Sequence, residues 1–161
     1  MKTLYLIRHA KSGWSGFTVS DFERTLNERG NNDAPKMAER LLNKKIKIDA
    51  FVSSPAIRAR QTCEHFCDVY KSSKKNIIFI DELYHAAPST IEKNVLNLDD
   101  KFDEVAIFSH NPGITEYAGS LIENVCIDNM PTCGIFAVSA NIEHWKDFSN
   151  EEKTLDRKST R

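Results

Sequence analysis

Short apolar runs alternate along this chain with longer segments in which apolar residues recur every three or four positions. Branched and aromatic side chains dominate the short runs, which is typical of buried strands. These runs lie at residues 4–7, 48–52, 77–80 and 105–108. The longer segments have the spacing of helices that bury one face. They lie near residues 34–42, 55–70, 91–98 and 114–122. Strands that alternate with helices predict a three-layer α/β/α fold, with helices on both faces of a mostly parallel sheet.

The pattern changes towards the C-terminus. Residues 134–139 and 143–148 alternate apolar and polar side chains, which predicts two strands joined by a turn. The remaining residues are polar and charged, which indicates a frayed tail. The sequence therefore predicts one domain over residues 1–148 and a polar C-terminal tail over residues 149–161.

Polar residues stand where the predicted helices begin. Asn27 or Asp33 is expected to cap the first helix, since both side chains accept hydrogen bonds from backbone N–H groups. Ser54 is followed by proline, a pair typical of an N-cap and the first helical position. Ser89 together with Glu92 fits a capping box for the third helix.

Composition narrows the possible classes of protein. With 161 residues, 40% hydrophobic and 28% charged, the chain is long enough for one packed domain. The net charge of −1 gives no basic field for nucleic acid, and no apolar run has membrane-spanning length. The N-terminal residues show no signal-peptide or lipidation pattern, so we expect a cytoplasmic protein. Four cysteines without a matching histidine pair predict reduced, mostly buried thiols.

Arginine and histidine occupy the ends of three predicted strands. Arg8 and His9 follow the first strand, Arg58 lies in the first turns of the helix after the second, and His110 follows the fourth. In a parallel sheet these ends lie on one edge, which is where open α/β sheets bind ligands. Each residue alone would be read as a surface or core group. Two arginines and two histidines at one edge favour a functional site.

The residue types point to phosphate chemistry. Guanidinium groups bind phosphate oxygens with paired hydrogen bonds and neutralise the charge of a phosphoryl group in transfer. The neutral imidazole of His9 can accept the phosphoryl group covalently, provided that its other ring nitrogen has an acceptor. A protonated His110 would be a further phosphate donor. The arginines take the place of a metal ion, so we expect no metal and no cofactor.

The same blocks resemble a known family. Residues 4–12, Leu-Tyr-Leu-Ile-Arg-His-Ala-Lys-Ser, resemble the start of the SixA-type phosphohistidine phosphatases. That group belongs to the histidine phosphatase superfamily, which includes phosphoglycerate mutases. Further blocks follow in the same order and cover almost everything except the tail. They are residues 20–24, 26–30, 33–35, 53–62, 82–86, 110–116 and 129–134.

The resemblance implies a phosphoglycerate-mutase-like fold and a metal-independent phosphohistidine phosphatase. In this reading His9 is the phosphorylated nucleophile, and Arg8, Arg58 and His110 complete the phosphate pocket. The chain lacks the inserted segments with which larger members cover a small substrate. An open site suits a phosphorylated protein, such as a phosphohistidine-bearing phosphotransfer domain, and we expect a monomer.

The identity of the proton donor stays open at this point. In the mutase-like branch a glutamate after the third strand protonates the leaving alcohol, and here His85 stands at that place with Glu82 three residues earlier. Either residue is a candidate donor or an ordinary loop residue. The lack of a glutamate at this place favours substrates with a P–N bond, because imidazole leaves phosphorus more easily than an alkoxide does.

Several other residues are candidates for binding the substrate. Lys11, Ser12 and Asn111 adjoin the expected pocket residues in the sequence. Trp14 and Phe17, in the aperiodic segment 12–24, would form either a rim for a partner protein or a local hydrophobic anchor. The alternative functions are a small-molecule phosphomonoesterase and a non-catalytic module that binds phosphoproteins. The physiological phosphoprotein cannot be named from the sequence.

Overall fold

A six-stranded mixed sheet forms the middle layer of the protein in the computed structural model, which describes residues 1–14, 16 and 19–159. The strands lie in the order β3-β2-β4-β1-β5-β6. They are β1 Lys2–Arg8, β2 Ala50–Ser53, β3 Ile78–Phe79, β4 Glu104–Ser109, β5 Ile135–Ala140 and β6 Lys153–Ser159. The first four run parallel, whereas β5 and β6 are antiparallel to their neighbours.

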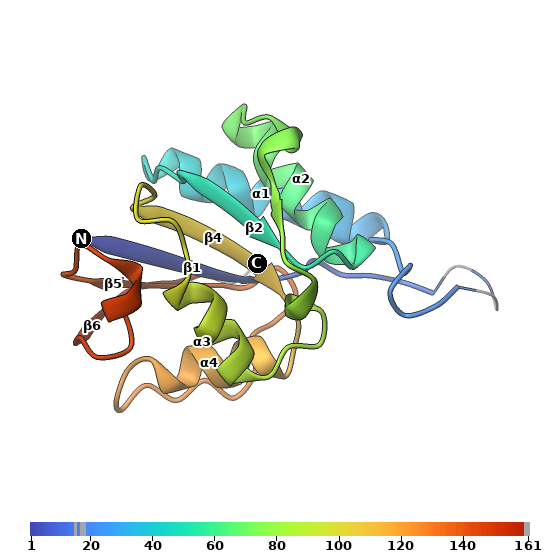
Figure 1. The fold of residues 1–161 in the computed structure, drawn as a ribbon. Helices are drawn as coiled ribbons and strands as arrows, with labels where there is room; N and C mark the ends of the chain where they lie inside the picture. The colour runs from blue at the N-terminus through green and yellow to red at the C-terminus, as the bar shows by residue number, and fades with distance from the viewer. Residues whose placement is uncertain (15, 17–18, 160–161) are drawn as a thin grey trace.

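Helices cover both faces of this sheet, as predicted (Figure 1). On one face α1 packs against α2, and on the other α3 packs against α4. These helices are α1 Glu28–Asn43, α2 Ile57–Tyr70, α3 Pro88–Leu96 and α4 Gly113–Ser120. The fold is therefore the expected three-layer α/β/α arrangement. No helix in the described part of the chain is both long and apolar enough to cross a bilayer.

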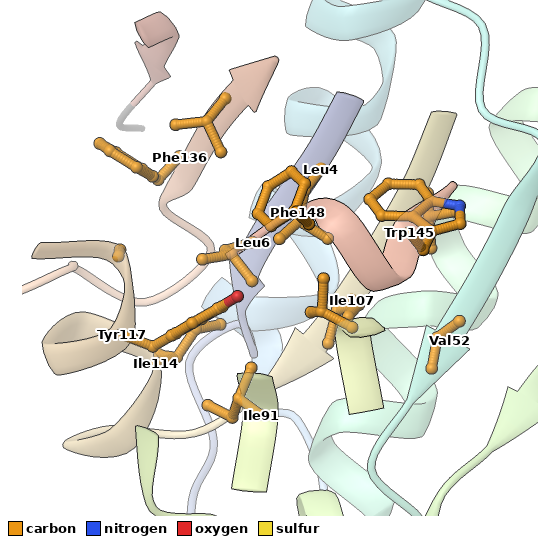
Figure 2. Packing of buried hydrophobic residues seen from close by; sticks show 14 of the residues in the cluster. Leu4, Leu6, Val52, Ile91, Ile107, Ile114, Tyr117, Phe136, Trp145 and Phe148 are labelled. Atoms are coloured by element: carbon orange, nitrogen blue, oxygen red, sulfur yellow. The ribbon is translucent and has the colours of Figure 1, made fainter. Parts of the chain in front are cut away.

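Alternation along β1 divides the hydrophobic core into two halves. Successive side chains of a strand point to opposite faces, so Leu4 and Leu6 pack with residues of α3 and α4, as Figure 2 shows. Tyr5 and Ile7 pack on the other face with residues of α1 and α2. Because β1 is buried on both faces and paired on both sides, the residues that follow it are held in fixed positions.

One predicted helix cap is confirmed and two are wrong. The Asn27 side chain accepts a hydrogen bond from the Gly30 N–H and caps α1. Helix α2 starts two residues later than expected, and the Ser54 hydroxyl binds His110 instead of capping it. Helix α3 begins with Pro88 after Ala87, and no side chain caps it.

The predicted frayed tail is wrong for residues 153–159. These residues form β6, which pairs with β5 along its whole length, with a register shift between Ala137 and Val138. The pairing uses backbone groups, so a polar sequence can form it, and charged edge strands are common. Leu155 adds an apolar contact with the core. The domain therefore extends beyond residue 148, while residues 160–161 of the predicted tail lie outside the described residues.

The predicted strand at residues 143–148 is also wrong. A short 3-10 turn, Trp145–Asp147, takes its place, and both Trp145 and Phe148 are buried against the face covered by α3 (Figure 2). Aromatic residues three positions apart lie on the same side of such a turn. The thiols of all four cysteines are reduced, and only Cys126 is exposed.

Candidate active site

Three adjacent strands deliver the predicted arginines and histidines to one cavity. Because β2, β4 and β1 are neighbours and parallel, their carboxyl ends lie side by side. The cavity has a volume of about 240 Å³. Its lining residues are Arg8, His9, Lys11, Ser12, Asp21, Arg24, Arg58, His85, His110, Asn111 and Thr132. The structure therefore brings together all four predicted core residues.

His9 is held as a neutral imidazole with a defined tautomer. Its Nδ1 lies 2.7 Å from the Ala10 carbonyl oxygen, an acceptor, so Nδ1 carries the proton and Nε2 keeps its lone pair. The backbone is fixed as well, since the His9 N–H donates to the Ser109 carbonyl. Burial, together with the charges of Arg58 and Arg8, lowers the pKa of His9 to about 4, despite the opposing hydrogen bond to Ala10. At neutral pH this nitrogen is available as a nucleophile.

His110 lies beside His9, with ring centroids 5.3 Å apart. Its Nε2 is 2.8 Å from the Ser54 hydroxyl, which also accepts the Ala56 N–H. The hydroxyl proton is thus free to be donated to Nε2, which places the imidazole proton on Nδ1. Nδ1 is buried, and the described residues offer it no partner. An oxyanion that reached Nδ1 would provide that missing acceptor.

The sequence left open whether His110 is protonated, and the structure favours the neutral ring. Burial, followed by the charges of His9 and Arg58, lowers the pKa of His110 to about 2. His110 is therefore neutral at physiological pH. It can still donate one hydrogen bond from Nδ1, and a bound dianion would favour its protonation.

Arg58 carries a buried positive charge at the bottom of the cavity. It is 3% exposed, and both terminal nitrogens contact Asp21: Nη1 donates to the backbone oxygen at 2.6 Å and Nη2 to the carboxylate at 3.0 Å. The Thr62 hydroxyl links this helix to the strand end, since it donates to the Arg58 carbonyl and accepts the Ala10 N–H. Arg8 approaches from β1, and its Nη1 donates to the Met130 carbonyl at 2.9 Å.

Asp21 is a cavity residue to which the sequence analysis assigned no role. Its Oδ2 accepts hydrogen bonds from Arg58, Tyr84 and His85, and its Oδ1 accepts one from Arg24. Partial burial acts to raise the pKa of Asp21, but the hydrogen bonds from Tyr84 and Arg24 and the charge of Arg58 hold the pKa far below its usual range. The carboxylate is therefore ionised at neutral pH.

Arg24 is a third arginine of the cavity, also without an assigned role in the sequence analysis. Its Nη2 donates to the Ser12 hydroxyl at 2.7 Å, and its guanidinium lies 4.5 Å from the centre of the Trp14 ring. The only sequence signal for Asp21 and Arg24 is that both lie in the block 20–24, inside an aperiodic loop. Trp14 is exposed at the rim, whereas Phe17 lies outside the described residues.

The three candidate substrate-binding residues all line the cavity. Lys11 is exposed at its rim, and Ser12 is buried and bonded to Arg24. The Asn111 amide donates to Asn129 and to the Met130 carbonyl. Asn111 therefore ties the segment that contacts Arg8 to the strand end that carries His110.

The two candidate proton donors occupy different environments. Glu82 is exposed and bonds to Lys93 and Asn94, outside the cavity lining. His85 lines the cavity, with Nε2 3.0 Å from the Asp21 carboxylate. The geometry thus brings one of the two candidates to the site.

His85 occupies its place because the surrounding structure fixes the loop. Its φ of 52° lies in the left-handed region, which few non-glycine residues adopt. The next residue, Ala86, approaches the start of α4 so closely that a Cβ at Gly113 would lie 1.9 Å from the Ala86 carbonyl oxygen. Glycine at position 113 therefore allows the loop to rest on the helix that follows His110.

The arrangement is suited to transferring a phosphoryl group to a nitrogen. The neutral imidazole of His9, with its Nε2 lone pair unprotonated, shares a cavity with the guanidinium groups of Arg8, Arg24 and Arg58. Such groups stabilise the charge on the equatorial oxygens of phosphorus during transfer. Within the described ranges, no cluster of three His, Cys, Asp or Glu side chains is placed to hold a metal ion.

Comparisons with known proteins agree with this chemistry. A family model described as the histidine phosphatase superfamily, branch 1, matches residues 4–86. An uncharacterized protein of Mycobacterium leprae is 30% identical over 118 residues, which are 71% of this chain and 70% of that protein. The family model thus covers the segments that carry Arg8, His9 and Arg58.

Solved structures share the fold over almost the whole chain. A candidate phosphohistidine phosphatase SixA from Agrobacterium tumefaciens superposes with a TM-score of 0.84 at 24% identity, over 99% of this chain and 98% of the other. The protein histidine phosphatase SixA complexed with tungstate superposes with a TM-score of 0.81 at 20% identity, over 97% of this chain and 95% of the other. A mycobacterial glucosyl-3-phosphoglycerate phosphatase superposes with a TM-score of 0.67 at 15% identity, over 96% of this chain and 97% of the other. At these identities the likeness establishes the fold, which both kinds of phosphatase share.

Proposed function

This chain belongs to the histidine phosphatase superfamily as a phosphatase, and we propose that it hydrolyses phosphohistidine on a protein, without a metal, through a phospho-His9 intermediate. The observation that carries the choice of phosphohistidine is the protonation state of the cavity. Asp21 is the carboxyl group among the described lining residues, and it is ionised. No carboxylic acid there can protonate a departing alkoxide. An imidazole that keeps a proton on its second nitrogen needs no such proton donor in order to leave.

The first step transfers the phosphoryl group to the enzyme. The Nε2 lone pair of His9 forms a bond to phosphorus, and the bond between phosphorus and the substrate nitrogen breaks, with its electron pair remaining on the leaving imidazole. Arg8 and Arg58 bind the phosphoryl oxygens, and the Nδ1–H of His110 donates to one of them. The Ala10 carbonyl accepts the His9 Nδ1–H and stabilises the positive charge that develops on the ring.

The second step regenerates the enzyme. A water oxygen bonds to phosphorus, the bond from phosphorus to His9 breaks, and its electron pair returns to Nε2. One water proton passes to solvent, so the products are hydrogen phosphate and neutral His9. The low pKa of His9 favours its departure as a neutral ring.

The exposure of the cavity supports a protein substrate. Lys11 and Trp14 are exposed at its rim, and the His85 side chain is 55% exposed. A phosphohistidine side chain on the surface of a phosphotransfer domain can approach such a rim without a lid having to open. We extend the proposal to a cytoplasmic monomer that acts on this class of partner.

The test measures phosphate release from a phosphohistidine-bearing phosphotransfer domain in the presence of EDTA. We expect release by the wild type and a loss of about a thousandfold or more in His9→Ala, because the nucleophile is removed. His144→Ala is the matched control, because His144 is exposed and bonds to Asp100 away from the cavity. Wild-type turnover by His9→Ala would contradict the mechanism.

Other outcomes would redirect the proposal. Loss of release on adding EDTA would contradict a metal-independent reaction. Release from phosphate monoesters but not from the phosphorylated domain would establish the small-molecule phosphomonoesterase instead. Tight binding of the phosphorylated domain without release would establish a binding module.

A further inference from the structure

The cavity changes in exposure from its bottom to its opening. Arg58 and His110 are each 3% exposed and His9 is 8% exposed, whereas the side chains of Asp21 and His85 are 34% and 55% exposed. We call the first three residues the floor, and Asp21, Tyr84 and His85 the mouth. The mouth residues are bonded to one another through the Asp21 carboxylate.

In an in-line displacement, the floor and the mouth contact different parts of the substrate. The attacking and leaving atoms stand on opposite sides of phosphorus. Because His9 attacks from the floor, the leaving group departs towards the mouth. Asp21 is therefore the negatively charged side chain, among the described lining residues, that the leaving group meets.

We propose that Asp21, held by Tyr84 and His85, is the leaving-group subsite and selects imidazole over oxygen leaving groups. The inference rests on the proposed function, and it names Asp21 as the residue that determines which class of substrate the enzyme hydrolyses. Phosphohistidine differs from a phosphate ester in one respect that a carboxylate recognises. Its ring can carry a proton, and hence a positive charge, on the nitrogen that is not bonded to phosphorus. An ester oxygen instead gains negative charge as it leaves, which a neighbouring carboxylate opposes.

The carboxylate has capacity for this hydrogen bond. Oδ1 of Asp21 accepts one bond from the described side chains, from Arg24 Nη1 at 3.1 Å, and a carboxylate oxygen accepts about two. The second N–H of the substrate ring can donate to Oδ1. When the P–N bond breaks, its electron pair stays on the ring nitrogen that was bonded to phosphorus. The other nitrogen keeps its proton, so the imidazole departs neutral and no proton transfer is needed.

The neighbours of Asp21 keep it charged and in place. The Tyr84 hydroxyl donates at 2.7 Å, and burial together with the carboxylate raises the pKa of Tyr84, so this donor stays protonated. The ring of His85 lies 4.1 Å from that of Tyr84, centre to centre, and forms one wall of the cavity. The leaving ring thus meets an aromatic wall as well as a negative charge.

The test compares two leaving groups on the same enzyme. The kcat/KM for a phosphohistidine peptide is divided by that for 4-nitrophenyl phosphate, in the wild type and in Asp21→Asn. Asp21 also contacts Arg58, so both values will fall, but a common loss cancels in the ratio. We expect the ratio to fall about ten- to a hundredfold, the size of one charge-assisted hydrogen bond.

Two further variants show whether the effect belongs to the charge. Glu23→Gln makes the same carboxylate-to-amide change in the same loop, outside the cavity lining, and should leave the ratio unchanged. Asp21→Glu keeps the negative charge, so its ratio should stay closer to wild type than that of Asp21→Asn. A thermal melt of each protein verifies folding.

The outcomes separate this inference from the function on which it rests. If the wild type hydrolyses the phosphohistidine peptide and Asp21→Asn keeps the wild-type ratio, the subsite is overturned and the function stands. If Asp21→Asn and Asp21→Glu lower the ratio equally, selection by charge is overturned. If the wild type hydrolyses only the ester, the proposed function falls and the subsite falls with it.

Discussion

The floor and the mouth of the cavity are built in different ways. His9 and His110 directly follow the neighbouring strands β1 and β4, and Arg58 lies in the first turn of α2. Asp21 and His85 lie in loops that the sheet does not contain, and side-chain hydrogen bonds hold them together. The floor is therefore positioned by the backbone of the core, and the mouth by polar side chains.

This difference separates two tasks of the enzyme. In the proposed mechanism the floor binds and transfers a phosphoryl group, which all substrates of a phosphatase have in common. The mouth meets the part of the substrate that varies. A buried charge also has a larger effect than an exposed one, because water screens the exposed charge. Removing single side chains from each region tests whether this division holds.

The largest contrast is expected between the two arginines that contact Asp21. Arg58→Ala should lower kcat/KM about 100- to 1,000-fold on both substrates, because a buried donor to the transferring phosphoryl group is lost. Arg24→Ala should lower it only about five- to tenfold, because the Arg24 side chain is 21% exposed and screened by water. Steady-state kinetics of the two variants measure the contrast. Equal losses would show that the buried and the partly exposed arginine contribute alike to transfer.

The buried histidine of the floor should make stability depend on pH. The pKa of His9 is lowered to about 4 from an ordinary value of 6.5, so between these values the unfolded chain binds more protons. The free energy of unfolding is therefore expected to fall as the pH drops through this window, by about 2 kcal/mol from His9 between pH 7 and pH 5. Urea denaturation at the two pH values measures this change.

A variant without the titrating ring isolates the contribution of His9. His9→Gln should show a smaller fall in unfolding free energy between pH 7 and pH 5. His144→Gln, on the surface, should keep the wild-type fall. A fall of the same size in all three proteins would assign the pH dependence to other groups.

The smallest effect is expected at α1, whose N-cap contacts Lys11 at the rim of the cavity. The Asn27 side chain caps α1, and the Asn27 backbone N–H donates to the Lys11 carbonyl. Asn27→Ala should lower the free energy of unfolding by about 1 kcal/mol. Its kcat/KM should stay near wild type, because Asn27 does not line the cavity. A large loss of activity would mean that the mouth is less independent of the helices than the structure indicates.

The floor could be predicted from the sequence because strand ends in a parallel sheet are a simple geometric rule. His9 and His110 of the floor follow apolar runs directly, as does the neighbouring Arg8, so their common edge follows from the order of the elements. To place Arg58 at the same edge, the helix that follows β2 had to be predicted as well. The neutral state of His110 could not be predicted, because it depends on burial that only the packed structure defines.

The mouth could not be predicted because no periodic pattern places it. Asp21 lies 37 residues from Arg58 and 64 from His85, and the folding of the loops together with side-chain hydrogen bonds brings them together. The β6 strand was missed for a related reason. An edge strand needs backbone partners but few apolar side chains, so its sequence resembles that of a tail. Trp145 and Phe148 were assigned to a strand because alternation over a few residues does not separate a strand from a turn.

The close contact of Gly113 with Ala86 restricts how such an enzyme can diversify. Any side chain at position 113 would push away the loop that carries His85. The side chain at position 85 meets no such contact, because it is half exposed, and only its φ of 52° restricts the replacements, to residues that tolerate the left-handed region. Mutations can therefore exchange the chemical group at the mouth one residue at a time, whereas an insertion that lengthens this loop must first break its contact with α4. New substrate preferences are accessible to this scaffold through side-chain replacement more readily than through loop growth.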